Sequence, residues 1–115
     1  MIVAGFGYRS GATAASLRSA LALAQAGAPT VTHVATLADK LPLLAALGLP
    51  VIAVEAVAGI ATPTHSAASL AARGSGSVAE AAALVAAGPG ARLIVSRQIS
   101  PDRMATCAIA EGAPA

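Results

Sequence analysis

An arginine stands among glycines and small hydroxyl residues near the start of the chain, in the stretch GFGYRSGAT. An apolar run that predicts a buried strand precedes this stretch, and an alanine-rich segment that predicts a helix follows it. A glycine-rich turn that opens a helix presents backbone N–H groups and the positive helix end, which attract anions. Arg9 adds a formal positive charge, so we expect Gly7, Arg9, Ser10 and Gly11 to bind an anionic ligand.

A second turn of the same kind, GSGS, precedes the segment VAEAAALVAAG. Ser77 is the predicted N-cap of a helix there, and Glu80 three residues later completes a capping-box pattern. We expect the N–H groups near Gly76 and Ser77 to face the same ligand. Capping accounts for Ser77 and Glu80 without any ligand, but Glu80 is also the candidate catalytic general base if the protein activates water.

The elements that position these turns are predicted from apolar periodicity and turn residues. Strands are expected at residues 2–6, 30–36, 51–55, 91–98 and 104–111, and helices at 12–27, 38–48 and, as two short pieces, within 66–88. The turn residues ISPD between the last two strands predict an antiparallel hairpin. We therefore predict one domain, residues 1–115, of the α/β class. It is a three-layer α/β/α fold whose five-stranded mixed, mainly parallel sheet ends in an antiparallel hairpin.

The predicted topology brings separate segments to one edge of the sheet. In right-handed β-α-β units, the carboxyl ends of the strands and the N-termini of the following helices share that edge. Thr36 and Lys40 after the second strand, and Arg97 at the end of the fourth, then lie beside the two glycine and serine turns. Cations around one crevice suit a ligand with several carboxylates or phosphates. The dinucleotide pattern GxGxxG fails at Ser10, but a nucleotide- or phosphate-binding α/β domain stays the alternative.

Composition excludes several classes of function. Of the 115 residues 57% are hydrophobic and 10% are charged, and such a chain is expected to self-associate as at least a dimer. Glycine and proline interrupt the long uncharged stretches and no signal-peptide pattern opens the chain, so we expect no membrane span and a cytoplasmic location. Cys107 is the single cysteine, and we expect no disulfide, metal or cofactor. A net charge of +2 with one Phe and one Tyr argues against a nucleic-acid partner.

Four segments of the chain, in order, resemble the family formed by CobE and the C-terminal domain of CbiG in cobalamin biosynthesis. They are GFGYRSGAT, VATLADK, GSGSVAEAAALVAAG and RLIVSRQISPDRMATCAIA. In this family a lysine after the second strand matches Lys40, and a basic residue closing the fourth strand matches Arg97. The threonine of the last strand matches Thr106. The resemblance covers nearly the whole chain.

This resemblance implies a role in building the corrin ring. CbiG-type proteins open a lactone on a cobalt-bearing ring intermediate and release a two-carbon aldehyde, whereas CobE belongs to the aerobic route. The implied function is to bind a polycarboxylate corrinoid or precorrin and to assist or catalyse a ring-modifying step, hydrolase-like if the protein is an enzyme. Other cobalamin-pathway enzymes are the implied protein partners. The family's first loop has a cysteine and usually two basic residues where this chain has Tyr8, Arg9 and Ser10, so no thiol chemistry carries over.

Overall fold

The computed structural model describes residues 1–55, 57, 62 and 77–113 of the chain. Its elements are β1 (Ile2–Tyr8), α1 (Ala14–Gln25), β2 (His33–Leu37), the 3-10 turn η1 (Ala38–Lys40), α2 (Leu41–Leu44), the 3-10 turn η2 (Ala45–Leu47), β3 (Val51–Val54), α4 (Val78–Ala87), β4 (Arg92–Ile99) and β5 (Ala105–Glu111). Among the described helices, none has the length and apolar character needed to cross a membrane.

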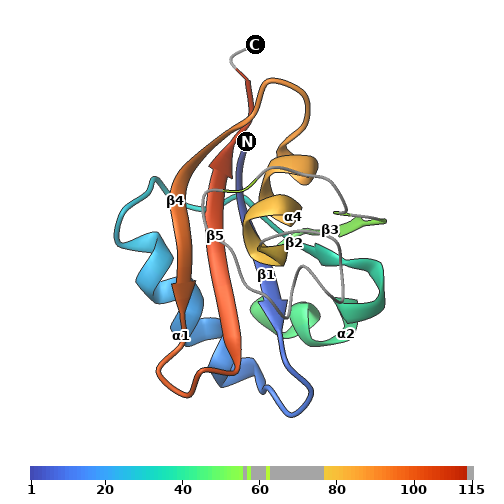
Figure 1. The fold of residues 1–115 in the computed structure, drawn as a ribbon, viewed down its shortest axis with the longest axis vertical. Coiled ribbons are helices and arrows are strands. Elements are labelled where there is room, and N and C mark those ends of the chain that lie inside the picture. Colours follow the sequence, from blue (N-terminus) through green and yellow to red (C-terminus); the bar gives the residue numbers. More distant parts are fainter. Residues whose placement is uncertain (56, 58–61, 63–76, 114–115) are drawn as a thin grey trace.

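The strands form one five-stranded sheet in the order β3-β2-β1-β5-β4. β2 pairs in parallel with both β1 and β3, whereas β5 is antiparallel to both β1 and β4. Four strands therefore run in one direction, and β5 runs against them between β1 and β4 (Figure 1). The predicted α/β class, mixed sheet and closing antiparallel hairpin are confirmed.

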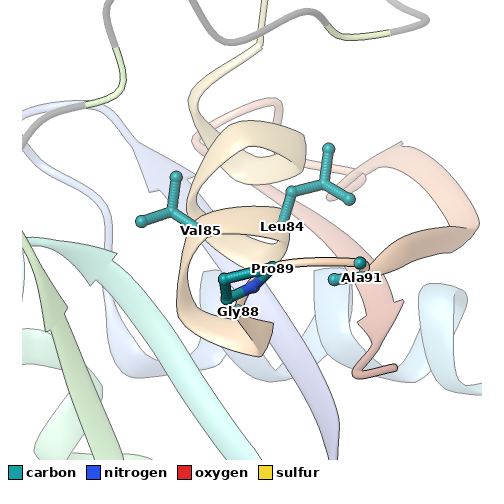
Figure 2. A pocket seen from close by; sticks show the side chains of 6 residues that line it. Leu84, Val85, Gly88, Pro89 and Ala91 are labelled. Carbon is teal, nitrogen blue, oxygen red and sulfur yellow. The ribbon is translucent and has the colours of Figure 1, made fainter. Parts of the chain in front are cut away.

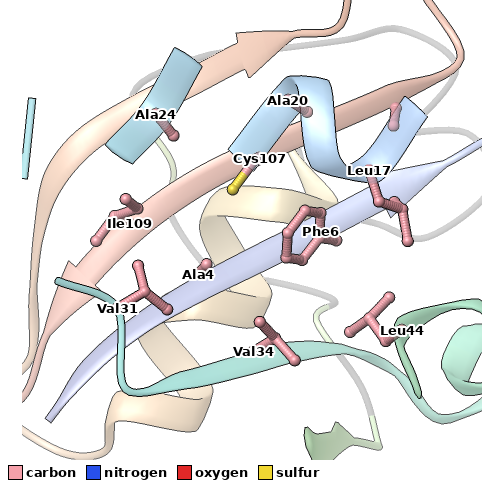
Figure 3. Close-up of a cluster of buried hydrophobic side chains, with 11 residues drawn as sticks. Ala4, Phe6, Leu17, Ala20, Ala24, Val31, Val34, Leu44, Cys107 and Ile109 are labelled. Atoms are coloured by element: carbon pink, nitrogen blue, oxygen red, sulfur yellow. The ribbon is translucent and has the colours of Figure 1, made fainter. Parts of the chain in front are cut away.

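Alternate residues of β1 face two different helical layers, because successive side chains of a strand point to opposite sides of the sheet. Ala4 and Phe6 belong to a core formed with α1 and α2, in which Leu17 and Leu44 are also fully buried (Figure 3). Val3 belongs to the core on the other side, which α4 covers with small side chains. The sheet is thus the middle layer of the predicted α/β/α arrangement.

Helix α4 approaches the backbone of β1 unusually closely at Gly5. A Cβ atom on Gly5 would lie 2.1 Å from the carbonyl oxygen of Ala79 and 2.5 Å from the amide nitrogen of Ala83. Small residues on both elements allow this approach, since Ala79 and Ala83 are fully buried against the strand. The absence of a side chain at Gly5 therefore allows α4 to pack this close to β1.

Several predicted boundaries differ from the observed ones. β1 continues beyond the predicted end to Tyr8, because β5 pairs with it as far as Ala105. The helix predicted at 38–48 is broken into short turns, although it closes as predicted at Gly48, whose φ is +73°. Of the two helices predicted within 66–88, α4 is observed, and the predicted first helix lies outside the described residues.

Candidate functional site

The candidate site lies at the edge of the sheet where β1, β2, β3 and β4 end. β1 leads there into a loop at residues 9–13, and β4 leads into a turn at 100–104, both at the lower end of the view in Figure 1. The N-terminus of α4 reaches the same edge, since a Cβ atom on Gly7 would lie 3.4 Å from the Cβ atom of Val78. The N-termini of α1 and α4 therefore lie at the same end of the sheet, on its two opposite faces, as the topology predicted.

Arg9 is exposed at the start of the loop that follows β1. Its backbone N–H donates to the carbonyl of Met104 at 2.9 Å, and its carbonyl accepts from the N–H of Ala12 at 3.0 Å. Ser10 and Gly11 are also exposed, and Gly11 has a φ of +93°, a conformation that favours glycine. The backbone of Arg9 is thus held by hydrogen bonds, and the residue is exposed to solvent.

Lys40 is brought next to the first loop by Tyr8. The phenol of Tyr8 donates a hydrogen bond to the backbone carbonyl of Lys40. The Lys40 ammonium lies 5.2 Å from the centroid of the Tyr8 ring, within the range of a cation–π interaction. Because Tyr8 immediately precedes Arg9, the backbone of Arg9 lies next to this contact between Tyr8 and Lys40. The sequence did not indicate this role of Tyr8.

Two threonine hydroxyls bind the last carbonyls of β1. The parallel pairing of β1 with β2 extends to Gly5, and beyond it the buried Thr36 hydroxyl donates to the Phe6 carbonyl at 2.8 Å. From the other side, Thr106 Oγ1 donates to the Gly7 carbonyl at 3.2 Å. The Thr36 hydroxyl, which was predicted to contact the ligand, therefore donates its hydrogen bond within the sheet. Gly7 lies beneath the start of α4.

Glu80 joins helix α4 to strand β4. Ser77 Oγ accepts the N–H of Glu80 at 3.3 Å, which confirms the predicted N-cap. The Glu80 side chain is fully buried, and its Oε2 accepts the N–H of Arg97 at 2.8 Å. β4 shifts register between Val95 and Gln98, so the Arg97 N–H lies in an irregular part of the ladder. Arg97 was expected to end the strand, but β4 continues to Ile99, because the hairpin pairs beyond the irregularity.

No sequence pattern indicated a role for Asp102, whose carboxylate accepts hydrogen bonds from the turn between β4 and β5 and from α1. Its Oδ1 accepts from Ser100 Oγ at 2.5 Å and from the Met104 N–H at 3.0 Å, and its Oδ2 accepts from Ser16 Oγ at 2.6 Å. These hydrogen bonds hold the pKa of Asp102 below its ordinary value, and the bond from the Ser100 hydroxyl has the largest effect. The turn residues ISPD indicated the turn, but nothing local indicated that Ser16 would reach it.

Three further expectations from the sequence concern Gly76, Cys107 and metal binding. Gly76 lies outside the described residues. Cys107 is fully buried, and burial raises the pKa of its thiol, which keeps it protonated. In the part of the chain that the structure describes, no group of three or more His, Cys, Asp or Glu side chains could hold a metal ion.

A shallow hollow of about 400 Å³ lies at the C-terminal end of α4, away from the candidate site (Figure 2). It is lined by Leu84, Val85, Gly88, Pro89, Gly90 and Ala91. Among the described residues that line it there is no predicted site residue and no charged side chain. The predicted site residues Gly7 and Ser77 lie instead at the N-terminal end of this helix.

Comparison with known proteins places the chain among proteins of one pathway. The family described as "Cobalamin synthesis G C-terminus" matches residues 2–110. The fold is similar to that of CobE, a protein from the cobalamin (vitamin B12) biosynthetic pathway, with a TM-score of 0.76 and 28% identity over 96% of this chain and 89% of that one. It is also similar to the cobalamin biosynthesis protein chiG from Agrobacterium tumefaciens str. C58, with a TM-score of 0.69 and 32% identity over 99% of this chain and 100% of that one. No curated protein sequence matches the chain.

Proposed function

Because the chain belongs to the cobalamin synthesis G C-terminus family and so has a role in cobalamin biosynthesis, we propose that it binds a corrin-ring intermediate at the carboxyl edge of the sheet. Corrin precursors are flat rings that carry several carboxylates. Each carboxylate that meets a lysine or arginine forms a charge-assisted bond, which is stronger than a neutral one. A site with several cations on one rim suits such a ligand.

The observation that carries this proposal is the contact between Tyr8 and Lys40 beside Arg9. The Tyr8 hydroxyl holds the Lys40 backbone through its carbonyl, and the Tyr8 ring lies 5.2 Å from the Lys40 ammonium, so the cation–π contact favours one position of this side chain before any ligand arrives. A restricted side chain loses less conformational entropy on binding, so the affinity per contact rises. The N-terminus of α4, capped by Ser77, adds the positive end of a helix at the same edge.

We further propose that binding presents the ring for a modifying step that this chain assists or carries out. The Glu80 carboxylate is buried and accepts the Arg97 N–H, which supports its role as the joint between α4 and β4. Its role as a general base in a lactone-opening hydrolysis stays a prediction. Other enzymes of the same pathway are the partners that would supply and take up the ring.

A titration tests the proposal directly. The purified chain is mixed with hydrogenobyrinic acid, a metal-free corrin with several carboxylates, and the visible spectrum of the ring is followed. We expect a saturable spectral change that excess ATP or NAD does not reverse. Arg92→Ala is the matched control, because Arg92 pairs with Glu111 at the opposite end of the sheet, and it should keep the affinity. Tight binding of ATP or NAD without corrin binding would support a nucleotide-binding domain instead.

A further inference from the structure

The hydrogen bonds at the candidate site connect the Arg9 loop to the turn between β4 and β5. The Arg9 N–H donates to the Met104 carbonyl at 2.9 Å, and the Met104 N–H donates to Asp102 Oδ1 at 3.0 Å. Asp102 Oδ2 accepts from Ser16 Oγ at 2.6 Å. The path from Arg9 thus crosses to the turn and returns through one carboxylate to the first turn of α1.

The same path closes within the loop itself. Ser16 Oγ accepts the Thr13 N–H at 3.1 Å as part of the capping box at the start of α1. The Ala12 N–H, next along the chain, donates to the Arg9 carbonyl at 3.0 Å. The loop that carries Arg9 is therefore enclosed in a ring of hydrogen bonds in which the Asp102 carboxylate is the ionised acceptor.

We propose that Asp102 is a positioning residue that holds the Arg9 loop in place for ligand binding. This inference rests on the proposed function, because it assigns Asp102 to the same corrin-binding edge. One carboxylate oxygen serves the turn through Ser100 and Met104, and the other serves α1 through Ser16. Bonds to an ionised acceptor are stronger than neutral ones, so this carboxylate is the strongest link of the ring.

The hairpin does not need the bond to Ser16 for its own closure. The Ser100 N–H donates to the Ala105 carbonyl at 2.9 Å, and the Ala105 N–H donates to Ser100 Oγ at 3.1 Å. These bonds close the turn from within. The bond between Ser16 and Asp102 instead ties the closed turn to the helix that follows the Arg9 loop, and this is a positioning role.

The backbone beside Asp102 adopts an unusual conformation. Arg103 has a φ of +61°, the left-handed region that a residue with a side chain rarely adopts. Its N–H donates to the Ser100 carbonyl at 2.8 Å. A strained residue persists where the surrounding bonds determine its conformation, and here those bonds converge on the Asp102 turn.

The test compares the wild-type chain with Asp102→Asn. The asparagine keeps the shape of the side chain and one carbonyl oxygen, but it turns an N–H₂ group toward Ser16 Oγ, which already accepts the Thr13 N–H. We expect the Arg9 amide to exchange with solvent about tenfold faster and the affinity for hydrogenobyrinic acid to fall about three- to tenfold. Glu111→Gln, which removes a carboxylate at the opposite end of the sheet, is the matched control and should change neither.

A double variant separates positioning from general destabilisation. If Asp102 acts through Arg9, adding Asp102→Asn to Arg9→Ala should lower the affinity little further, because the positioned group is already gone. An effect of Asp102→Asn that is as large in the Arg9→Ala background would overturn the inference. So would an unchanged exchange rate of the Arg9 amide in Asp102→Asn, or a faster rate with unchanged affinity.

Ser16→Ala breaks the ring at a second point and keeps the test decisive if Asp102→Asn fails to fold. It should raise the exchange of the Arg9 amide and lower corrin affinity in the same direction, and a folded Ser16→Ala chain with wild-type values would count against the inference. A wild-type chain that does not bind the corrin would overturn the proposed function itself. The exchange of the Arg9 amide would then still report whether Asp102 holds the loop.

Discussion

At the scale of single residues, the site separates groups that a ligand can reach from groups that hold the site together. Arg9 is exposed and its backbone is bonded to Met104, whereas Thr36 and Glu80 are buried with their polar atoms bonded inside the fold. An exposed cation at the end of a strand contributes little to the free energy of unfolding. Substitution of each kind of residue should therefore affect different measurements.

Replacing Arg9 by alanine should weaken binding without unfolding the protein. Its backbone bonds to Met104 and Ala12 remain, so the free energy of unfolding should change by no more than about 0.5 kcal/mol. The lost charge-assisted bond is worth roughly 1.5–3 kcal/mol, which is at least about tenfold in corrin affinity. Titration of folded protein at matched salt measures this. Ser77→Ala should lose less affinity, and unchanged affinity in Arg9→Ala would leave the first loop a structural turn.

Two substitutions at Glu80 distinguish the joint from the general base. Glu80→Gln keeps a side-chain oxygen for the Arg97 N–H and should stay close to wild type in stability, whereas Glu80→Ala leaves that N–H unpaired and should cost roughly 1–3 kcal/mol. Chemical denaturation measures both free energies of unfolding. If the chain also hydrolyses a ring lactone with Glu80 as base, Glu80→Gln should abolish turnover while it stays folded. Equal stability of Glu80→Ala and the wild type would contradict the role of Glu80 as the link between α4 and β4.

At the scale of elements, the position of α4 depends on the absence of a side chain at Gly5 of β1. Helix and strand meet backbone to backbone at Gly5, and the alanines of α4 fill the contact. The N-terminus of α4 reaches the site because of this packing. The turn between β4 and β5 is linked to α1 by a hydrogen bond, which Ser16 donates to Asp102.

Adding a single methyl group at Gly5 should separate α4 from the sheet. Its Cβ would lie 2.1 Å from the Ala79 carbonyl oxygen, a backbone atom, so Gly5→Ala should destabilise the fold by about 3 kcal/mol or more. Gly27→Ala is the matched control, because its Cβ would meet Val95 at an ordinary 3.5 Å. It should change the free energy of unfolding by no more than about 0.5 kcal/mol. Thermal denaturation of both variants measures this, and equal midpoints would contradict the packing.

The bonds to Asp102 predict how its contribution depends on pH. The folded-state pKa of Asp102 is lowered from its ordinary 3.8, so its contribution to stability is present above that pH and is lost as the pH falls through the folded pKa. The difference in unfolding free energy between wild type and Asp102→Asn should therefore shrink as the pH drops below 3.8. Urea denaturation of both proteins across this range measures it. A difference that stays constant with pH would show that the ionised carboxylate does not stabilise the fold.

At the scale of the whole molecule, the small share of charged residues leaves apolar side chains at the surface. Leu23 is 47% exposed and Val85 is 40% exposed. The alanines of α4, in contrast, do not form such a surface, since Ala79 and Ala81–Ala83 are fully buried. The expectation of self-association therefore rests on the side chains at the surface of α1 and at the far end of α4.

We expect the protein to form at least a dimer in solution. Burial of exposed apolar area offsets the limited core that a chain of 11.0 kDa can build. Sedimentation velocity at micromolar concentration measures the mass directly. A monomer across that range would contradict the expectation, and Val85→Glu should shift the equilibrium toward the monomer if the α4 end forms the contact.

The sequence alone determined the class of fold, the order of most elements, the cap of α4 at Ser77 and the stop at Gly48. It also determined the family, on the glycine and arginine loop and the later segments. The elements, the cap and the stop depend on residues within a few positions of one another, because periodicity, caps and turns are set by local backbone geometry. The expectation that Arg9 and Lys40 lie at one edge came instead from the alternation of strands and helices, which sets the direction of successive strands.

Only the tertiary structure decided how distant segments meet. It inserted β5 between β1 and β4, extended β1 to Tyr8 and shifted the register of β4 so that the Arg97 N–H reaches Glu80. It also joined Ser16 to Asp102, 86 residues away along the chain. Each of these contacts depends on which strands pair and how closely helices pack on them. No local pattern encodes such pairing, since it results from the combined burial of the whole core.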